Sequence, residues 1–492
     1  MVTETRDFAA HRIAQPSVAR SVLLAGAVAI VVGLAAAIYP LAAFLIAAVV
    51  LVLAFALGNL SAMERTMATA LVGGAMVLGY GFANVGIRTG GIPIPLTEIL
   101  FLPLAAIALA DRKTRLDGRV LLPLTLYAIL VLIRLFFDYP NWGVFAVRDT
   151  TAALEAFILV IGYRAVARDG VALWMRRMGY VAGAVILWGA TTPFQQQIEA
   201  MSPTVGLQRP TPLLDQRGVK FSVIAAALYF LIFHRGWKRM LALGVVAGLV
   251  GIFQARTLYV LFPVSILIVG WAAHRLGRVT MQVVPIVIVG ALLIVAAGSL
   301  GIQGRRGEVS FNFIESHALT LLGEEGPMAG SIEGRKEWFG LTMDFVFSSP
   351  WYVVGGVGLG PDLTFGELKG KQGQDVRKPH DDYLEVFART GLIGFSLFVW
   401  LLLSCVIPIA KKARSGTGLN EKACAWILGA SVVYMGVAGA QPLLSFPYGS
   451  VPLFFLLGMG VAISRRPDLA PVERVELFST GRRELPSSLG PA

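Results

Sequence analysis

Apolar stretches of about 20 residues recur along nearly the whole sequence, and they restrict the possible folds more than any other feature. Each is long enough to cross a hydrocarbon core of about 30 Å as a helix. Runs such as SVLLAGAVAIVVGLAAAIY are continuous rather than alternating, which favours helices over the strands of a membrane barrel. Hydrophobic residues make up 56% and charged residues 15%, which leaves too little polar surface for water-soluble domains. We therefore predict an all-α polytopic membrane protein.

The distribution of charge predicts how the chain crosses the membrane. The apolar stretches give about 14 transmembrane helices, within a range of about 12 to 14. Lys and Arg accumulate in alternate short connections such as DRKTRLDGR and HRGWKR, whereas residues 301–389 contain nine Lys and Arg against 13 Asp and Glu. Basic connections are retained in the cytoplasm, so the long acidic segment is expected to form one large periplasmic loop. This predicts a multi-pass protein of a bacterial inner membrane with both termini cytoplasmic, and it attributes the net charge of +12 to topology rather than to nucleic-acid binding.

The same pattern divides the chain into five segments. They are a cytoplasmic N-terminal tail at 1–19, transmembrane helices 1–11 at 20–300, the large periplasmic loop at 301–389, transmembrane helices 12–14 at 390–465 and a disordered cytoplasmic tail at 466–492. The first apolar stretch is expected to be a retained span rather than a cleaved signal. Cys405 and Cys424 are expected to be small packing residues without a disulfide.

Three ionisable residues fall inside predicted spans, namely Glu98, Arg134 and Glu155, and Arg148 lies just outside one. Such residues are costly in lipid and are functional candidates for that reason. The simpler interpretation is structural, with Arg134 paired to a glutamate to hold helices together. In either case the charges lie in the outer halves of their spans.

His380 is the strongest candidate for catalysis among the five histidines. In KPHDDYLEVFARTGLIG, Pro379 interrupts the chain and either Asp381 or Asp382 is expected to cap a helix. A helix N-terminus lowers the pKa of a histidine and favours nearby anions, so a neutral His380 could act as a base beside a phosphate. The alternative is a structural capping histidine. A metal site is disfavoured because three consecutive side chains diverge around a helix start, and His317 is expected to be a surface residue.

Arginines in the outer connections are candidates for phosphate binding, because a guanidinium can bind phosphate through two parallel hydrogen bonds. Arg256 occupies the tight hairpin QARTLYV, Arg335 lies in EGRKEWFG, and Arg209 lies in the shorter outer connection 191–217. A lone cation at a membrane edge often extends to lipid headgroups, which is the simpler interpretation of Arg209. The run VVGGVGLGP at 353–361 lacks the spacing of a nucleotide-binding loop and is expected to form a turn.

Two segments together resemble the signature of the O-antigen ligase and polymerase superfamily, GRKEWFGLTMDFVFSSPWYVVGGVGLGP and PHDDYLEVFARTGLIGFSLFVW. The resemblance covers roughly residues 210–410. It consists of an arginine in a hairpin, Arg-x-x-Trp before a Pro- and Gly-rich turn, and His-x-x-Tyr-Leu entering a span. The chain departs from the pattern at Ala255, where a serine is common, and at Asp381, where asparagine is frequent. The additional carboxylate of Asp381 is expected to raise the pKa of His380.

The resemblance implies a glycosyltransferase that uses neither a metal nor a cofactor. Such an enzyme moves a glycan from an undecaprenyl-diphosphate carrier to a sugar hydroxyl at the periplasmic face, as a polymerase or a ligase. Carried over by position, Arg256 and Arg335 would bind the donor diphosphate, and His380 would orient or deprotonate the acceptor hydroxyl. Supporting candidates are Arg209, Tyr383 and Asp381. The implied partners are the lipid-linked glycan donor, a glycan or lipid A-core acceptor, the lipid bilayer and other polysaccharide assembly proteins, with no nucleic acid.

Two other classes of function stay open at this point. A transporter or flippase of the same carrier would keep its key charges near the midplane and show related halves. A non-catalytic scaffold of a polysaccharide assembly complex would leave Arg256, Arg335 and His380 without a shared purpose. Between polymerase and ligase, a polymerase is slightly preferred because two outer connections could present two chains.

Overall fold

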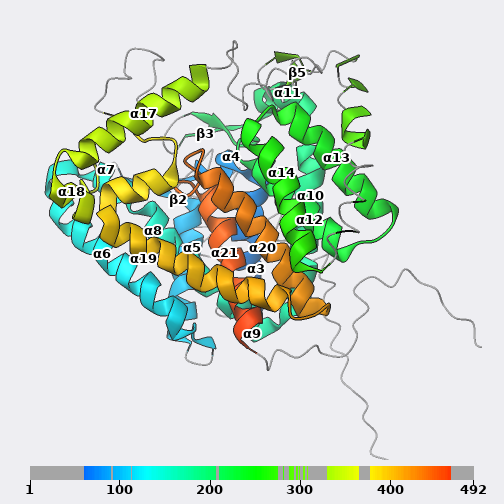
Figure 1. Cartoon of the computed structure of the whole chain (residues 1–492), viewed down its shortest axis with the longest axis horizontal. Coiled ribbons are helices and arrows are strands. Elements are labelled where there is room, and N and C mark those ends of the chain that lie inside the picture. The colour runs from blue at the N-terminus through cyan, green and yellow to red at the C-terminus, as the bar shows by residue number, and fades with distance from the viewer. Residues whose placement is uncertain are drawn as a thin grey trace, which may run out of the picture.

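The computed structural model describes residues 60–89, 92–111, 114–206, 210–274, 330–364 and 377–466, together with short pieces between 277 and 308. This part of the chain is mostly helical, as Figure 1 shows. Several sequence predictions lie outside the described residues: the two tails, the spans centred near residues 29 and 50, His317 and Arg209.

The described elements are predominantly helices joined by short connections. The helices are α3 (Leu60–Leu78), α4 (Tyr80–Ala83), α5 (Leu96–Ala110), α6 (Gly118–Trp142), α7 (Val144–Asp149), α8 (Thr151–Glu155), α9 (Ile158–Asp169), α10 (Val171–Gly189), η2 (Thr192–Phe194), α11 (Gln195–Met201), α12 (Val219–Phe233), α13 (Trp237–Phe253), α14 (Arg256–Ala272), α17 (Gly330–Phe347), α18 (Pro350–Gly355), α19 (Asp382–Ala413), α20 (Leu419–Ala438) and α21 (Pro447–Arg465). Three small antiparallel hairpins pair β1 (Gly86–Thr89) with β2 (Ile92–Pro95), β3 (Thr204–Val205) with β4 (Thr211–Pro212), and β5 (Gln303–Gly304) with β6 (Gly307–Glu308).

The chain is embedded in a membrane through apolar helices. Within the described ranges, three helices are long and apolar enough to cross it, namely α6, α19 and α21, and shorter apolar helices are α5, α12 and α14. The predicted class of helical membrane protein is therefore confirmed, while the number of spans stays a prediction. Cys405 and Cys424 are free and buried, as predicted.

The core forms around α20 and α21, which lie in the middle of the view in Figure 1. On one side are α6 and α19, and on the other are α10, α12, α13 and α14. Helix α21 packs closely on α9 because both helices present glycines at the contact. A side chain at Gly162 would meet the carbonyl of Phe455 at 2.1 Å, and one at Gly458 would meet the carbonyl of Leu159 at 2.0 Å. Small residues at such crossings let helix backbones approach in lipid.

Helix α19 is broken at Gly391, so that its first turns form a separate short segment. Gly391 has φ of 64°, a left-handed conformation that glycine adopts without strain. The break lets the backbone pass against the end of α18, where a side chain at Gly391 would lie 2.3 Å from the carbonyl of Val354. The head of α19 is thus fixed to α18 independently of the long apolar segment that follows.

The span predicted near residue 158 is also interrupted, into α7, α8 and α9. Two threonines contribute to the interruption because their hydroxyls bond to backbone carbonyls of the preceding turn. Thr150 donates to the carbonyl of Val147 at 2.7 Å, and Thr151 donates to that of Arg148 at 2.8 Å. The break makes Asp149 the C-terminal residue of α7, and its carboxylate contacts Lys378 and Arg389.

The other end of the bundle is held by ion pairs. Arg164 of α9 bonds to Glu64 of α3 at 2.7 Å and also contacts Asp111. Arg465, at the C-terminus of α21, contacts Asp117 at 2.5 Å. Figure 1 places α9 at the opposite edge of the molecule from α17. Charged side chains therefore gather at both ends of the bundle.

Candidate functional site

The head of α19 is fixed by two adjacent aspartates that point in different directions. Asp381 is the N-cap, and its Oδ1 accepts from the backbone N–H groups of Tyr383 at 2.9 Å and Leu384 at 3.1 Å. This confirms one of the two predicted caps. Asp382 is buried and turns away, toward the connection between α20 and α21. Its Oδ2 accepts from two backbone N–H groups, those of Leu443 at 2.6 Å and Leu444 at 2.7 Å.

His380 lies immediately before this helix head and packs on an aromatic ring. Its imidazole is tilted by 43° against the indole of Trp338, with ring centroids 4.5 Å apart. The Nδ1 atom lies 3.4 Å from the backbone carbonyl of Lys378. A carbonyl only accepts, so this contact assigns the proton of the neutral ring to Nδ1 and leaves Nε2 as the basic nitrogen. The predicted divergence of His380 from its two aspartate neighbours is also observed.

The pKa of His380 is lowered from its ordinary value, and burial is the main cause. The positive charge of Arg335 lowers this pKa further, while the contact with the Lys378 carbonyl and the charge of Glu385 raise it. The predicted direction from the helix position is therefore correct, but its dominant cause is desolvation. The carboxylate of Asp381 accepts the two hydrogen bonds of the cap, and the net shift in the pKa of His380 is downward, so a rise from Asp381 stays a prediction.

The structure brings Arg335 and His380 together through α17. Arg335 and Trp338 are three residues apart on this helix, so they share one face. Trp338 contacts the imidazole directly, and Arg335 is near enough for its charge to affect the pKa of His380. Arg335 is exposed, whereas His380 is half-buried. A cation and a neutral base therefore adjoin at the surface of this end of the bundle.

Arg256 lies at the same end of the bundle as Tyr383. It is the first residue of α14, which packs against α20 with Leu261 beside Gly436 and Val269 beside Gly429. This antiparallel register places the start of α14 near the end of α20. Tyr383 reaches that end of α20 from α19, where its hydroxyl donates to the carbonyl of Met435 at 2.9 Å. Helix packing thus directs Arg256 toward the region of the His380 segment.

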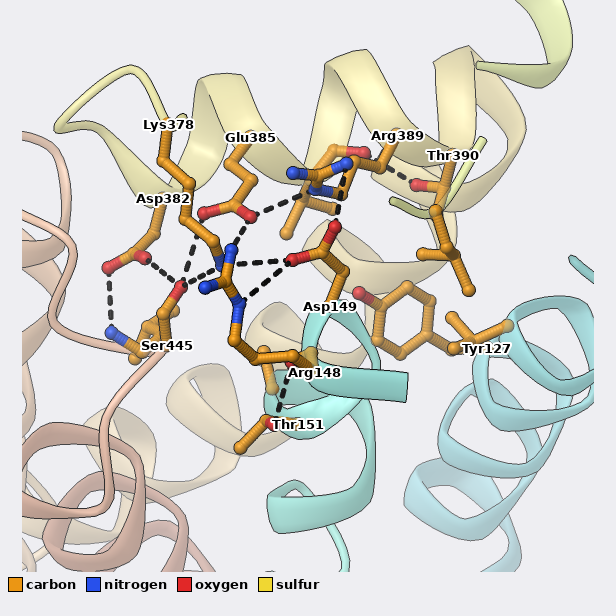
Figure 2. Close-up of a pocket in the computed structure, with 15 residues that line it drawn as sticks. Tyr127, Arg148, Asp149, Thr151, Lys378, Asp382, Glu385, Arg389, Thr390 and Ser445 are labelled. Atoms are coloured by element: carbon orange, nitrogen blue, oxygen red, sulfur yellow. Dashed lines mark hydrogen bonds and ion pairs between the residues drawn. The ribbon is translucent and has the colours of Figure 1, made fainter. Parts of the chain in front are cut away.

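A buried cluster of four charged side chains includes Lys378, two residues before His380 (Figure 2). Lys378 Nζ contacts Glu385 Oε1 at 2.7 Å and Asp149 Oδ1 at 3.4 Å. Arg389 bonds to the same two carboxylates, through Nε to Glu385 at 2.9 Å and through Nη1 to Asp149 at 2.9 Å. The two cations and two anions form a closed ring that joins α7, the 377–381 segment and α19. Side-chain exposure is 0% for Asp149 and 3% for Arg389, so water screens these pairs little.

Sequence reasoning missed this cluster. The spacing of Glu385 and Arg389, four residues apart on a helix, was a detectable local signal for an ion pair. The contribution of Asp149 was not detectable, because it comes from a helix more than 200 residues earlier in the chain. Arg148, which the sequence places just outside a predicted span, lines the pocket that contains this cluster. Its Nε atom lies 3.9 Å from Asp149.

The predicted turn is only partly correct, because residues 353–355 of the glycine-rich run complete α18 and the non-helical part begins at Gly356. Aspartates hold this non-helical part. The backbone N–H of Leu359 donates to Asp138 at 2.7 Å, and that of Gly360 donates to Asp149 at 2.9 Å. Asp149 therefore connects the turn to the buried charge cluster.

The charges inside the predicted spans have structural partners. Arg134 donates to the carbonyls of Gly355 and Gly356 at the C-terminus of α18, the latter at 3.2 Å. The predicted pairing of Arg134 with a glutamate was therefore wrong, since unpaired carbonyls at a helix end attract a cation. Glu155 is buried and accepts from the Ser450 hydroxyl, while Glu98 accepts from Thr97 at 2.5 Å.

An apolar groove of about 640 Å³ lies on α6 and α7, one residue away from Arg148. Its lining is formed by Leu132, Leu135, Phe136, Phe137, Tyr139, Pro140 and Val147. The groove therefore offers an apolar surface beside the charged end of the bundle.

The fold and this site define a class: a helical membrane protein with a histidine, a tryptophan and an arginine gathered near a buried charge cluster at one end. A scan against models of known protein families finds no match, and a search of curated proteins finds no similar sequence.

Proposed function

We propose that this protein is a metal-independent glycosyltransferase of the O-antigen polymerase and ligase type, which takes its glycan from an undecaprenyl-diphosphate carrier. One observation carries the proposal. A half-buried histidine with a lowered pKa, ordered by the indole of Trp338, lies beside the exposed cation Arg335 at one end of a membrane-embedded helical bundle. A neutral base next to a cation is what transfer from a diphosphate to a hydroxyl requires.

The chemistry is a single displacement at the anomeric carbon of the donor sugar. The acceptor hydroxyl oxygen forms a bond to that carbon as the bond from carbon to the diphosphate oxygen breaks. The diphosphate leaves with the electron pair, and its developing charge is met by Arg335 and Arg256. Nε2 of His380 takes the proton of the hydroxyl. Tyr383 and Asp381 support the site by fixing the head of α19.

The membrane arrangement belongs to the same proposal. The chain would cross a bacterial inner membrane about 12 to 14 times, with both termini cytoplasmic and the His380 end in the periplasm. The carrier lipid would reach this end from within the bilayer, and the groove on α6 and α7 supplies an apolar surface for its chain. The acceptor would be a second carrier-linked glycan or lipid A core.

The test is glycan transfer by the purified protein in nanodiscs. Undecaprenyl-diphosphate oligosaccharide would be supplied with carrier-linked glycan or lipid A core as separate acceptors, and glycan length would be followed for the wild type and for His380→Ala. We expect transfer that His380→Ala reduces by about 10²- to 10⁴-fold, the range for loss of a general base. The acceptor that becomes elongated separates polymerase from ligase.

A matched histidine variant controls for nonspecific loss. His274 is exposed and bonds to the carbonyl of Arg414 at 2.7 Å, and α14, which precedes it, begins with Arg256 at the other end. His274→Ala should therefore leave transfer unchanged. If the wild type transfers no glycan to either acceptor but moves the carrier across a sealed bilayer, the protein is a flippase and the proposal fails. Absence of both activities would support a scaffold.

A further inference from the structure

We propose that Lys378 is a positioning residue for His380, fixing the backbone carbonyl that holds Nδ1 of the imidazole. The inference rests on the proposed function for its meaning in catalysis, but its geometry can be tested separately. It deepens that proposal by naming the side chain that would present Nε2 to the acceptor hydroxyl.

The ammonium of Lys378 is held from three directions. It contacts Glu385 of α19 at 2.7 Å and Asp149 of α7 at 3.4 Å, and it donates to the hydroxyl of Ser445 at 3.4 Å. Figure 2 shows these partners converging on its terminal nitrogen. The side chain is 18% exposed, so the charge is largely removed from water. A largely buried ammonium with these partners has few alternative positions, because leaving them would remove one of the two cations that balance the buried carboxylates of Asp149 and Glu385.

A stiff link connects this anchor to the imidazole. Only Pro379 separates Lys378 from His380, and the pyrrolidine ring fixes one of the two backbone dihedrals of that residue. Pro379 is itself buried. Fixing the Lys378 side chain therefore also fixes the carbonyl of Lys378, which lies 3.4 Å from Nδ1 of His380.

The ring is then confined between this carbonyl and the indole of Trp338. The charged groups that act on it come from two helices, Arg335 of α17 and Glu385 of α19. The hydrogen bonds and ion pairs of the Glu385 oxygens in the described structure go to Lys378, Arg389 and Ser445. Lys378 is thus the residue through which the buried cluster reaches the catalytic base.

A double-mutant cycle tests the proposal. Lys378→Met should lower the turnover number about 10²-fold with little change in the Michaelis constant, because misplacing a catalytic group by about 1 Å costs this much. In the His380→Ala background the same substitution should have no further effect, since Lys378 acts only through His380. Lys378→Arg, which keeps the ion pairs, should recover most of the rate. Equal losses with and without His380 would overturn the proposal, because a general structural role would lower both.

The control variant is Lys412→Met, which removes an ion pair of the same 2.7 Å length, to Glu421, at the far end of α19. It should leave turnover unchanged. If Lys378→Met does not fold, Glu385→Gln weakens the same anchor with an isosteric side chain, and it is expected to show the same dependence on His380.

A second readout does not require glycan transfer, so failure of the proposed function and failure of this inference can be told apart. The rate at which diethylpyrocarbonate modifies His380, followed by mass spectrometry, should rise several-fold in Lys378→Met because the released imidazole becomes more exposed. Lys412→Met should leave that rate unchanged. Unchanged modification of His380 in Lys378→Met would contradict the proposal even if the wild type transfers no glycan.

Discussion

The imidazole of His380 rests on the indole of Trp338, with their ring centroids 4.5 Å apart, although the two residues belong to different segments of the chain. The contact joins helix α17 to the segment that leads into α19. It therefore connects the cation of Arg335 to the base, and the account of function depends on this connection.

Removing the indole should release the imidazole. We expect Trp338→Ala to lower glycan transfer about 10²-fold, as for other misplaced catalytic groups, while Trp338→Phe keeps an aromatic surface and most of the activity. Trp351 on the adjacent α18 is 81% exposed and serves as the control, since Trp351→Ala removes an indole of equal size away from the site. Initial rates of transfer for the three variants check this prediction. Equal loss in both alanine variants would show that the contact has no special role.

The decrease in the rate of glycan transfer at low pH should follow the protonation of His380. Its pKa is lowered from 6.5, so the ring is neutral at neutral pH and becomes protonated only as the pH falls below 6.5. Transfer should therefore be constant at neutral pH and fall with a midpoint below 6.5. Arg335→Gln removes a charge that lowers this pKa, so the midpoint should move to higher pH.

The pH dependence of diethylpyrocarbonate modification of His380 in the protein without substrate measures this shift. Because no donor is present in this measurement, the change in the pKa of His380 is separated from any effect of Arg335 on donor binding. A midpoint that moves to lower pH in Arg335→Gln would contradict the assignment.

Adjacent aspartates at the head of α19 should differ in their contribution to stability. Asp382→Ala leaves two buried backbone N–H groups, those of Leu443 and Leu444, without their acceptor, which should cost about 3 kcal/mol of the free energy of unfolding. Asp381→Ala removes only a helix cap and should cost about 1 kcal/mol. Thermal unfolding in one detergent compares the two variants, and a larger effect at Asp381 would be inconsistent with the structure.

The break in α19 should not tolerate a side chain. Gly391→Ala places a methyl group where φ is 64° and where the carbonyl of Val354 is 2.3 Å away, so we expect a loss of at least about 1 to 3 kcal/mol in stability. Gly183→Ala in α10 meets nothing within 4 Å and should be neutral or slightly stabilising. Unfolding midpoints of the two proteins check this, and equal midpoints would show that the break is not required.

Local signals in the sequence predicted the head of α19 well. Pro379 and Asp381 are enough to place a helix start, and the apolar stretches are enough to identify a helical membrane protein. The partner of Arg134 could not be predicted in the same way, because it bonds to backbone carbonyls that every residue possesses.

The buried charge cluster required the three-dimensional fold. Lys378, Glu385 and Arg389 are close in the sequence, but Asp149 becomes their neighbour only through the break between α7 and α8. The break at Gly391 depends likewise on the approach of α18, which no local pattern specifies. The juxtaposition of Arg335 and His380 was expected only from the resemblance, and the structure supplies its physical basis in Trp338.

The most direct measurement of the central claim is the release of undecaprenyl diphosphate per glycan transferred, in nanodiscs containing a chelator, for the wild type, His380→Ala and His274→Ala. The account predicts one carrier released per transfer for the wild type and His274→Ala, with both quantities lost together in His380→Ala while its thermal unfolding is unchanged. Transfer by a folded His380→Ala at the rate of the wild type would contradict it.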